Sequence, residues 1–379
     1  MFDATPSTPP IRPIAFHLPQ FHPTPENDAF WGKGFTEWRN VVQARPRFPG
    51  HAQPHLPADL GFYDLRLPET RAAQADLARA AGLHGFCYYH YWFNGRRVLN
   101  APVDAILESG TPDFPFMLCW ANENWTRAWD GGAREVILAQ SYSDADTKAH
   151  ARHLARAFTD PRYIRIADRP VFAVYNTDDL PDPRRWSDLF RETLAREGIT
   201  PYLIRVERYL DEDLRPPAEL GFDAALEFQP FSRNFRRWLE TRPDLKRHLP
   251  RRIAHRLRRE AARLRPLDTH YDMRAFAAFD TCQPAPDYTC FPGVCPSWDN
   301  SARRPRGKAI IFRNASPKLF ADWLTAQLHA FQPKAEENLL FINAWNEWAE
   351  GCHLEPCLRE GSAWLDAVQH VTADLEARG

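Results

Sequence analysis

Two glutamates near the end of the chain have the spacing and surroundings of a pair that could break a glycosidic bond. Glu347 and Glu350 lie three residues apart after an apolar run, with Trp345 and Trp348 beside them. Glycoside hydrolysis needs one protonated carboxyl group near the leaving oxygen and one carboxylate near the anomeric carbon. A neighbouring indole excludes water and raises the pKa of a carboxyl group, which favours its protonated form. We therefore predict Glu347 and Glu350 as catalytic residues, although a helix cap or an arginine ion pair would also explain Glu350.

A third glutamate is an alternative member of this pair. Asn122-Glu123 follows an earlier apolar run, and the Asn-Glu sequence is often found at the acid/base position of retaining barrel glycosidases. Glu123 and Glu347 would then share the chemistry. Glu227 and Asp299 also follow apolar runs, and we interpret them as groups that hydrogen-bond a substrate or support the fold.

Aromatic, amide and imidazole side chains surround these carboxylates, and the chain contains 13 Trp and 11 Tyr. Tryptophan and tyrosine combine a flat apolar face with a polar edge, which suits stacking against a sugar ring. Amides and carboxylates can hydrogen-bond the hydroxyl groups of the ring. The pattern therefore predicts a carbohydrate substrate. The predicted substrate-binding residues are His17, Gln20, His22, Tyr89, Trp92, Trp120, Asn122, Glu123, Trp125, Glu227, Trp298, Asp299, Trp345 and Asn346.

These residues follow short apolar runs that alternate with helical segments. Eight runs have the composition of buried strands, at residues 11–17, 85–91, 116–121, 171–175, 202–206, 224–228, 289–296 and 339–345. Helical spacing and end signals predict helices over residues 68–81, 144–158, 184–197 and 316–331. Eight repeats favour an α/β fold of the (β/α)₈ (TIM) barrel type over an open doubly wound sheet. In such a barrel the C-terminal strand ends meet at one face, where we expect the candidate residues to converge.

Two segments depart from this alternation within a single predicted catalytic domain that spans residues 1–379. Residues 19–68 are predicted to form a long loop after the first strand, and loops of this length are usually functional. Residues 233–265 form a basic insertion between the sixth and seventh strands, with apolar residues at helical spacing from Ile253 to Leu264. We expect a basic amphipathic helix that caps the barrel or contacts an anionic membrane surface or polysaccharide.

The composition argues against several other classes of protein. Lys and Arg number 48 against 49 Asp and Glu, so the chain has no overall attraction for nucleic acid. Without a long apolar stretch or an N-terminal secretion signal, the sequence predicts a cytoplasmic protein with no transmembrane segment. The seven cysteines form no C-x-x-C pair, and neither a dinucleotide fingerprint nor a P-loop is found. We therefore expect no metal and no other cofactor.

Several long motifs resemble those of a known family. They are A-F-H-L-P-Q-F-H-P at 15–23, P-E-N-D at 25–28, W-G-K-G-F-T-E-W at 31–38, C-W-A-N-E-N-W at 119–125, P-S-W-D-N at 296–300 and N-A-W-N-E-W-A-E-G at 343–351. The set resembles the WbsX-type family, named for glycosyltransferases of bacterial surface-polysaccharide loci. That family is similar to glycoside hydrolase family 99, the endo-α-mannosidases and endo-α-mannanases.

The resemblance implies a (β/α)₈ barrel and places the E-x-x-E pair of family 99 on Glu347 and Glu350. By this resemblance Glu347 would assist the sugar's own 2-hydroxyl group, which attacks the anomeric carbon to give a 1,2-anhydro intermediate. Glu350 would serve first as acid and then as base. Such chemistry favours α-mannosides and α-rhamnosides, in which O2 is trans to the leaving group. Family 99 has a His between its glutamates where this chain has Ala349, so some substrate contacts are expected to differ.

Three hypotheses for the function follow. The first is a retaining glycoside hydrolase that acts on an α-linked, manno- or rhamno-configured bacterial polysaccharide or oligosaccharide. The second is a glycosyltransferase of surface-polysaccharide biosynthesis, such as that of the lipopolysaccharide O-antigen or of a capsule. The third is a non-catalytic sugar-binding barrel, for which two closely spaced glutamates would be unnecessary.

Overall fold

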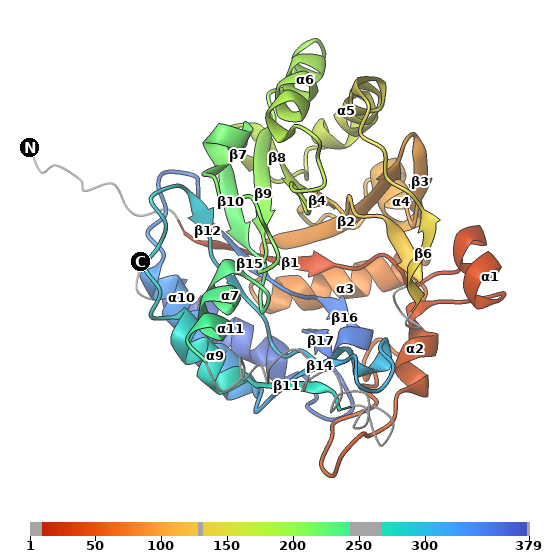
Figure 1. Cartoon of the computed structure of the whole chain (residues 1–379), viewed down its shortest axis with the longest axis vertical. Helices are drawn as coiled ribbons and strands as arrows, with labels where there is room; N and C mark the ends of the chain where they lie inside the picture. The colour runs from red at the N-terminus through yellow and green to blue at the C-terminus, as the bar shows by residue number, and fades with distance from the viewer. Residues whose placement is uncertain (1–9, 128–131, 243–266, 377–379) are drawn as a thin grey trace, which may run out of the picture.

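The structure is a computed structural model that describes residues 10–127, 132–242 and 267–376. Its centre is a barrel of parallel strands surrounded by helices (Figure 1). In spatial order the first seven barrel strands are β10 (Ala224–Glu227), β9 (Tyr202–Glu207), β8 (Arg169–Val174), β4 (Phe116–Trp120), β2 (Gly85–Phe93), β1 (Arg12–His17) and β15 (Leu339–Ile342). These strands are almost entirely buried, as expected for a parallel sheet that helices cover on its outer face.

A short broken strand joins the two edges of this sheet. β12 (Cys290–Phe291) pairs with β10, and β13 (Gly293–Val294) pairs with β15. Pro292 separates them because it has no backbone N–H for the ladder, although its carbonyl accepts a hydrogen bond from the amide of Phe341 at 2.9 Å. Residues 290–294 therefore act as the eighth position of the barrel. The predicted (β/α)₈ fold is confirmed.

The predicted helices are also present, within a few residues of their expected ends. They are α3 (Pro68–Ala80), α5 (Asp144–Phe158), α6 (Pro183–Ala195) and α10 (Pro317–Ala330), and the outer layer also includes α4 (Ala101–Ser109), α9 (Met273–Asp280) and α11 (Ala363–Glu376). Several begin at a side-chain cap: Ser143, Asp182 and Ser316 each accept a hydrogen bond from the amide three residues later. Such caps satisfy amides that a helix leaves unpaired at its start.

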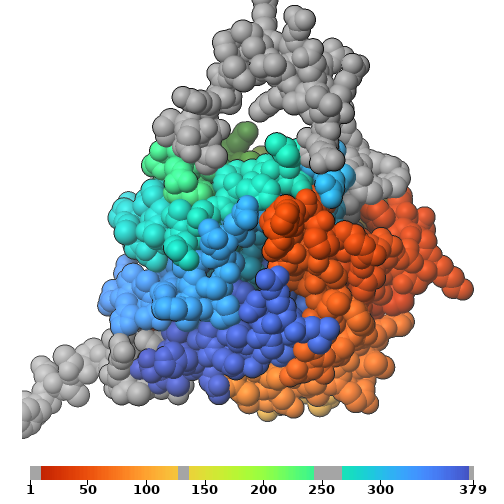
Figure 2. All heavy atoms as spheres, turned by 90° about the horizontal axis from the view of Figure 1, so that it is seen from below, coloured from red at the N-terminus to blue at the C-terminus, as the bar shows by residue number. Residues whose placement is uncertain are grey.

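The long segment after β1 is more ordered than a loop. It contains α1 (Pro25–Trp31), which Thr24 caps, and α2 (Glu37–Gln43). Its later part pairs with the C-terminal region, where Pro57 forms a bridge with Cys357. Figure 2 shows this N-terminal segment, in red and orange, against the C-terminal part of the chain, in blue. The expectation of a long loop over 19–68 is therefore wrong for its two helical parts, each of which is only seven residues long and too short to show a helical period in the sequence.

Smaller elements extend the strand ends. They are β3 (Arg96–Val98), the hairpin β5 (Trp125–Arg127) and β6 (Gly132–Leu138), β7 (Arg165–Ile166), η2 (Pro217–Leu220), the parallel pair β11 (Thr269–Asp272) and β14 (Ile310–Arg313), η3 (Asn300–Ala302), β16 (Asn346–Glu347), η4 (Trp348–Glu350) and β17 (Cys352–His353). Of the predicted basic insertion, the structure describes α7 (Arg233–Glu240). The apolar positions from 253 to 264 lie outside the described residues. No helix of the described residues has the length and apolar composition needed to cross a membrane.

Barrel closure predicts a sensitive position at Gly293. A Cβ atom added there would lie 2.1 Å from the carbonyl oxygen of Glu227 on the neighbouring strand. We expect Gly293→Ala to lower the free energy of unfolding by about 3 kcal/mol, measured by urea denaturation. Gly110→Ala is the control, because its Cβ meets no atom within 4 Å and only the left-handed backbone at φ 71° opposes it. Equal losses in the two variants would contradict this account of closure.

Candidate active site

A cavity of about 400 Å³ opens at the C-terminal ends of the barrel strands. Both Glu347 and Glu350 line it, together with Gln20 and Glu123. Its aromatic wall is formed by Tyr89, Tyr91, Phe93, Trp125, Tyr175, Tyr209, Phe228, Phe231 and Trp298. The combination of aromatic faces with a few carboxyl and amide groups is typical of a pocket for a hydroxylated ring.

The two glutamates lie in a tight turn that follows β15. Glu347 ends β16 and Glu350 ends η4, while Trp348 and Ala349 between them are buried. Gly351 follows with φ 56°, a backbone conformation that glycine adopts at little cost. The turn is fixed from outside, because the amide of Asp299 donates to the carbonyl of Glu350 at 2.6 Å. Both carboxyl groups are thereby presented to the same cavity.

Arg303 lies at the centre of the carboxyl groups. Its guanidinium contacts Glu347 through Nη2 at 2.7 Å and Glu350 through Nη1 at 2.9 Å. Its Nε donates to Glu37 at 2.6 Å, so a third carboxylate, from α2, joins the group. The Arg303 side chain is only 9% exposed, and that of Glu37 is fully buried. One cation thus links three carboxylates from distant parts of the chain.

The protonation of this group follows from its burial. Burial raises the pKa of Glu347, and the negative charges of Glu350 and Glu37 add to that effect. Burial likewise raises the pKa of Glu350, with a further contribution from Glu37. The guanidinium of Arg303 opposes the rise at both sites. Because like charges so close together resist joint ionisation, we expect Glu347 and Glu350 to hold one proton between them near neutral pH.

Glu123 lines the same cavity. Its Oε1 accepts from Arg208 Nη1 at 2.6 Å and from Asn176 Nδ2 at 3.0 Å, while its side chain remains 49% exposed. The Arg208 guanidinium also covers the Tyr175 ring at 4.8 Å from its centre. Glu123 is therefore a half-exposed ion-pair partner, whereas Glu347 is buried.

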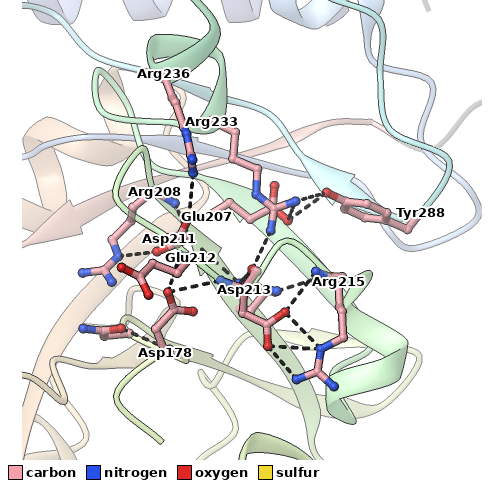
Figure 3. A network of polar contacts seen from close by, with 12 residues as sticks. Asp178, Glu207, Arg208, Asp211, Glu212, Asp213, Arg215, Arg233, Arg236 and Tyr288 are labelled. Atoms are coloured by element: carbon pink, nitrogen blue, oxygen red, sulfur yellow. Dashed lines mark hydrogen bonds and ion pairs between the residues drawn. The ribbon is translucent and has the colours of Figure 1, made fainter.

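The loop after β9 holds Arg208 in place (Figure 3). Asp211 accepts from the Arg208 backbone amide at 2.7 Å and from its Nε at 3.2 Å. Arg236 of α7 donates to the carbonyl of Asp211 at 2.9 Å, and Asp178 accepts from the amide of Glu212 at 2.6 Å. The Arg208 side chain is thus a fixed part of the cavity wall.

The structure brings together about half of the residues that the sequence predicts for the site. The predicted residues that line the cavity are Gln20, Tyr89, Glu123, Trp125, Trp298, Glu347 and Glu350. The predicted residues that do not line it are His17, His22, Trp92, Trp120, Asn122, Glu227, Asp299, Trp345 and Asn346. Most of the nine lie at or just after the ends of barrel strands, as expected, but protein contacts hold their side chains away from this cavity, and Asp299 lines a second one.

Several of these nine residues tie strand ends together. Asn346 accepts from the Leu18 amide at 2.7 Å and donates to the Leu18 carbonyl at 3.0 Å. Asn122 makes the same double contact with the backbone of Asn176, at 2.7 and 2.6 Å. Asp299 accepts from His51 at 2.6 Å and lines a separate cavity of about 270 Å³. These contacts explain why Asn346, Asn122 and Asp299 are polar although none of them lines the cavity that contains Glu347 and Glu350.

The others are packed between the barrel and its helices. His17 contacts Gln74 at 3.2 Å, and burial lowers its pKa to about 3, which keeps the imidazole neutral. Trp92 stacks on His150 and donates to Asp146 at 2.9 Å, while Trp120 stacks on Trp186. Trp345 packs against Phe86 in the core, and His22 is buried. Glu227 accepts from Asn234 at 3.1 Å, and both burial and the charge of Asp280 raise its pKa.

None of the three arginines that line this pocket was predicted from the sequence. Arg208, Arg303 and Arg304 lie in irregular segments, where no strand or helix period marks the residues that face a cavity. Glu37 lies within the W-G-K-G-F-T-E-W motif at 31–38, so its position was visible although its function was not. Among the described residues, no group of three or more His, Cys, Asp or Glu side chains is arranged to hold a metal ion.

A (β/α)₈ barrel with paired carboxyl groups in an aromatic cavity has the architecture of a carbohydrate-active enzyme. The family model described as Glycosyltransferase WbsX matches residues 13–368, and the chain belongs to this family. Two curated relatives from Xanthomonas campestris pv. campestris, strains B100 and ATCC 33913, are both called Uncharacterized protein WxcX and are 43% identical over 376 residues. The match covers 97% of this chain and 50% of each relative, so the chain spans about half their length.

Solved structures share the fold. Two structures of the GH99 endo-alpha-mannosidase from Bacteroides thetaiotaomicron, one in complex with BIS-TRIS-Propane, have TM-scores of 0.58 and cover 97% of this chain and 98% of theirs. Their sequence identities are 13% and 14%. A Glycoside hydrolase-like protein has a TM-score of 0.58 at 14% identity and covers 96% of this chain and 94% of its own. At these identities the likeness concerns the barrel itself.

The Arg303 contacts predict a stability that depends on pH. Without the guanidinium, the pKa values of Glu347 and Glu350 should rise further above 4.5. A carboxyl group with a raised pKa binds its proton more tightly in the folded state, so stability falls as pH increases above the unfolded value. We expect Arg303→Met to lose about 3 to 5 kcal/mol at pH 8 and clearly less at pH 5, by urea denaturation at each pH.

Arg96→Met is the control for this prediction. Arg96 pairs with Glu26 at 2.8 Å, but its side chain is 54% exposed, and such pairs contribute little. Its loss should be small and similar at the two pH values. An Arg303→Met variant that behaves in the same way would contradict the buried-cluster account.

Proposed function

We propose that the protein is a retaining glycoside hydrolase for α-linked bacterial polysaccharides or oligosaccharides of manno or rhamno configuration. The observation that carries the proposal is the pair Glu347 and Glu350, both lining one aromatic cavity and both bound to Arg303. The likeness of the barrel to GH99 endo-alpha-mannosidases adds support from the fold. Sugar-binding residues are proposed among the lining groups, namely Gln20, Tyr89, Glu123, Trp125 and Trp298.

In the first step Glu347 accepts the proton of the substrate 2-hydroxyl group. O2 then attacks the anomeric carbon as the bond from that carbon to the leaving oxygen breaks, and Glu350 donates its proton to the leaving oxygen. A 1,2-anhydro sugar results, with Glu347 protonated and Glu350 ionised. The resting pair must therefore carry one proton, on Glu350, with Glu347 ionised. Burial raises the pKa of both groups, that of Glu347 to about 8, and the Arg303 guanidinium opposes the rise and favours the ionised form.

In the second step Glu350 takes a proton from water as the water oxygen attacks the anomeric carbon. The bond from that carbon to O2 breaks, and Glu347 returns its proton to O2. Both carboxyl groups regain their starting states, and two inversions at one carbon give overall retention. The negative charge moves from Glu347 to Glu350 in the first step and back in the second. Arg303 contacts both carboxyl groups, so its positive charge stabilises the ionised one in each state.

A transferase is the second candidate, because the matched family is described as Glycosyltransferase WbsX. In surface-polysaccharide biosynthesis, such as that of an O-antigen or a capsule, a sugar hydroxyl would replace water in the second step. Incubation with an acceptor oligosaccharide and either an α-glycoside or a nucleotide sugar would separate the two functions. Products that form only when the nucleotide sugar is present would favour the transferase and contradict the hydrolase.

If Glu350 is the acid, the loss of activity in Glu350→Gln should depend on how much the leaving group of the substrate needs a proton. We expect kcat/KM to fall about 10³-fold on alkyl α-mannosides or α-rhamnosides, and far less on aryl glycosides whose leaving groups need no proton. Glu347→Gln should impair both kinds of substrate, because it removes the group that activates O2. Initial rates on both substrate series would be measured by product analysis.

Glu123→Gln is the matched control in the same cavity. We expect less than a tenfold change, since this carboxylate forms a half-exposed pair with Arg208. If Glu123→Gln instead shows the leaving-group dependence expected of Glu350→Gln, then Glu123 is the acid/base residue.

Participation of O2 has its own test. A 2-O-methyl glycoside has no proton for Glu347 to remove and should not be hydrolysed by the wild-type protein. The first-formed product from the unmodified glycoside should be the α anomer by proton NMR. Hydrolysis of the methylated substrate at a normal rate, or a β anomer as first product, would overturn this mechanism.

A further inference from the structure

A fourth carboxyl group lies beneath the turn that carries Glu347 and Glu350. Glu355 follows β17, is only 1% exposed and does not line the cavity. Its Oε2 accepts from the indole Nε1 of Trp348 at 2.6 Å and from the hydroxyl group of Tyr63 at 2.8 Å. Its Oε1 accepts from Gln74 at 2.6 Å. Three neutral donors thus converge on one buried carboxylate.

These donors connect the carboxylate to both sides of Glu347. Trp348 is the residue after it, and Asn346, the residue before it, donates to the Tyr63 hydroxyl group at 3.2 Å. Trp348 is also the first residue of the turn that ends at Glu350. The Trp348 ring stacks on His353 with 3.8 Å between centroids, so it has one well-defined orientation. A change at Glu355 would therefore reach both proposed catalytic residues through a single side chain.

We propose that Glu355 is a positioning residue, which holds the Trp348 indole and thereby sets the placement of Glu347 and Glu350 in the cavity. This inference rests on the proposed function. Removing the carboxylate leaves the Trp348 N–H and the Tyr63 hydroxyl group buried without their acceptor, a cost that favours rearrangement of the turn. Because a shift of about 1 Å can cost about 100-fold in rate, a small rearrangement is sufficient to impair the reaction.

The polar contacts also bear on the charge of Glu355. Burial raises its pKa to about 7, while the hydrogen bonds from Trp348, Gln74 and Tyr63 act in the opposite direction. Donors to both oxygens suit a carboxylate. In Glu355→Gln, the side-chain oxygen could still accept hydrogen bonds from Trp348 and Tyr63. The new amide group would then face Gln74, whose own amide would have to rotate so that its oxygen accepts the hydrogen bond. Glu355→Gln is thus the conservative variant, and Glu355→Ala is the disruptive one.

Asp280 provides a matched control elsewhere in the barrel. It is 2% exposed and accepts from the indole of Trp323 at 2.9 Å, from Asn234 at 2.9 Å and from Gln327 at 2.7 Å. Its chemistry therefore matches that of Glu355, yet neither Asp280 nor Trp323 lines the catalytic cavity. Asp280→Ala reports the cost of losing a buried, indole-bound carboxylate without an effect on the turn.

The experiment compares Glu355→Ala, Glu355→Gln and Asp280→Ala by unfolding midpoint, by steady-state kinetics across pH, and by NMR of ¹⁵N-labelled tryptophan. The kinetics use the glycoside that the wild-type protein hydrolyses best among the alkyl and aryl series. We expect Glu355→Ala to lower kcat about 10- to 100-fold with little change in KM, and to shift the pH profile. Glu355→Gln should restore most of kcat. Asp280→Ala should lose stability while its kcat and pH profile stay near those of the wild type.

The NMR measurement follows the Trp348 indole directly and needs no substrate. The Trp348 indole resonance, assigned through Trp348→Phe, should move in Glu355→Ala and stay unmoved in Asp280→Ala. A folded Glu355→Ala protein with normal kcat and pH profile would overturn the positioning role, as would an equal loss of kcat in Asp280→Ala. If no glycoside is hydrolysed, the proposed function fails. If the Trp348 indole resonance does not move in Glu355→Ala, the positioning role of Glu355 is wrong, whether or not the proposed function holds.

Discussion

The contact between the Arg303 guanidinium and three carboxyl groups is the interaction on which the rest of the site depends. Taking the charges of Arg303, of Glu37 and of the Glu347–Glu350 pair out of water is costly, and the cost is offset only when their mutual geometry is good. Glu37 comes from the helical segment after β1, Arg303 from the segment after the broken strand, and Glu347 and Glu350 from the turn after β15. The site therefore exists only when three distant parts of the chain have assembled.

Behind this cluster lies a second layer of polar residues that never reaches the cavity. Asn346, Tyr63, Trp348 and Glu355 exchange hydrogen bonds beneath the turn, and Asn346 fixes it to the end of β1. A buried polar network of this kind is costly if one member is missing, because each remaining group keeps its desolvation cost. The same property makes the network specific: it permits one arrangement of the turn and penalises others.

The carboxyl groups that line the cavity differ in their electrostatic surroundings. Glu347 is buried beside Arg303, and burial raises the pKa of its carboxyl group to about 8. Glu123 is half exposed and paired with Arg208. A carboxylate in the first environment suits acid/base chemistry, whereas one in the second suits recognition of substrate hydroxyl groups. The chain belongs to the WbsX family, while 13% to 14% identity to the solved GH99 structures shows the fold alone.

The sequence by itself determined the barrel and the stretches of chain at its mouth, because apolar runs such as 202–206 and capped helices such as 144–158 are local patterns. It also determined that Glu347 and Glu350 lie close together, since three residues of a turn cannot separate them far. Only the tertiary structure decided which strand-end residues face the cavity. Asn346 and Glu347 are neighbours, yet one is bonded to Leu18 and the other to Arg303, because successive side chains of an extended segment point in opposite directions. The partners of both are far away in sequence, and no local pattern encodes them.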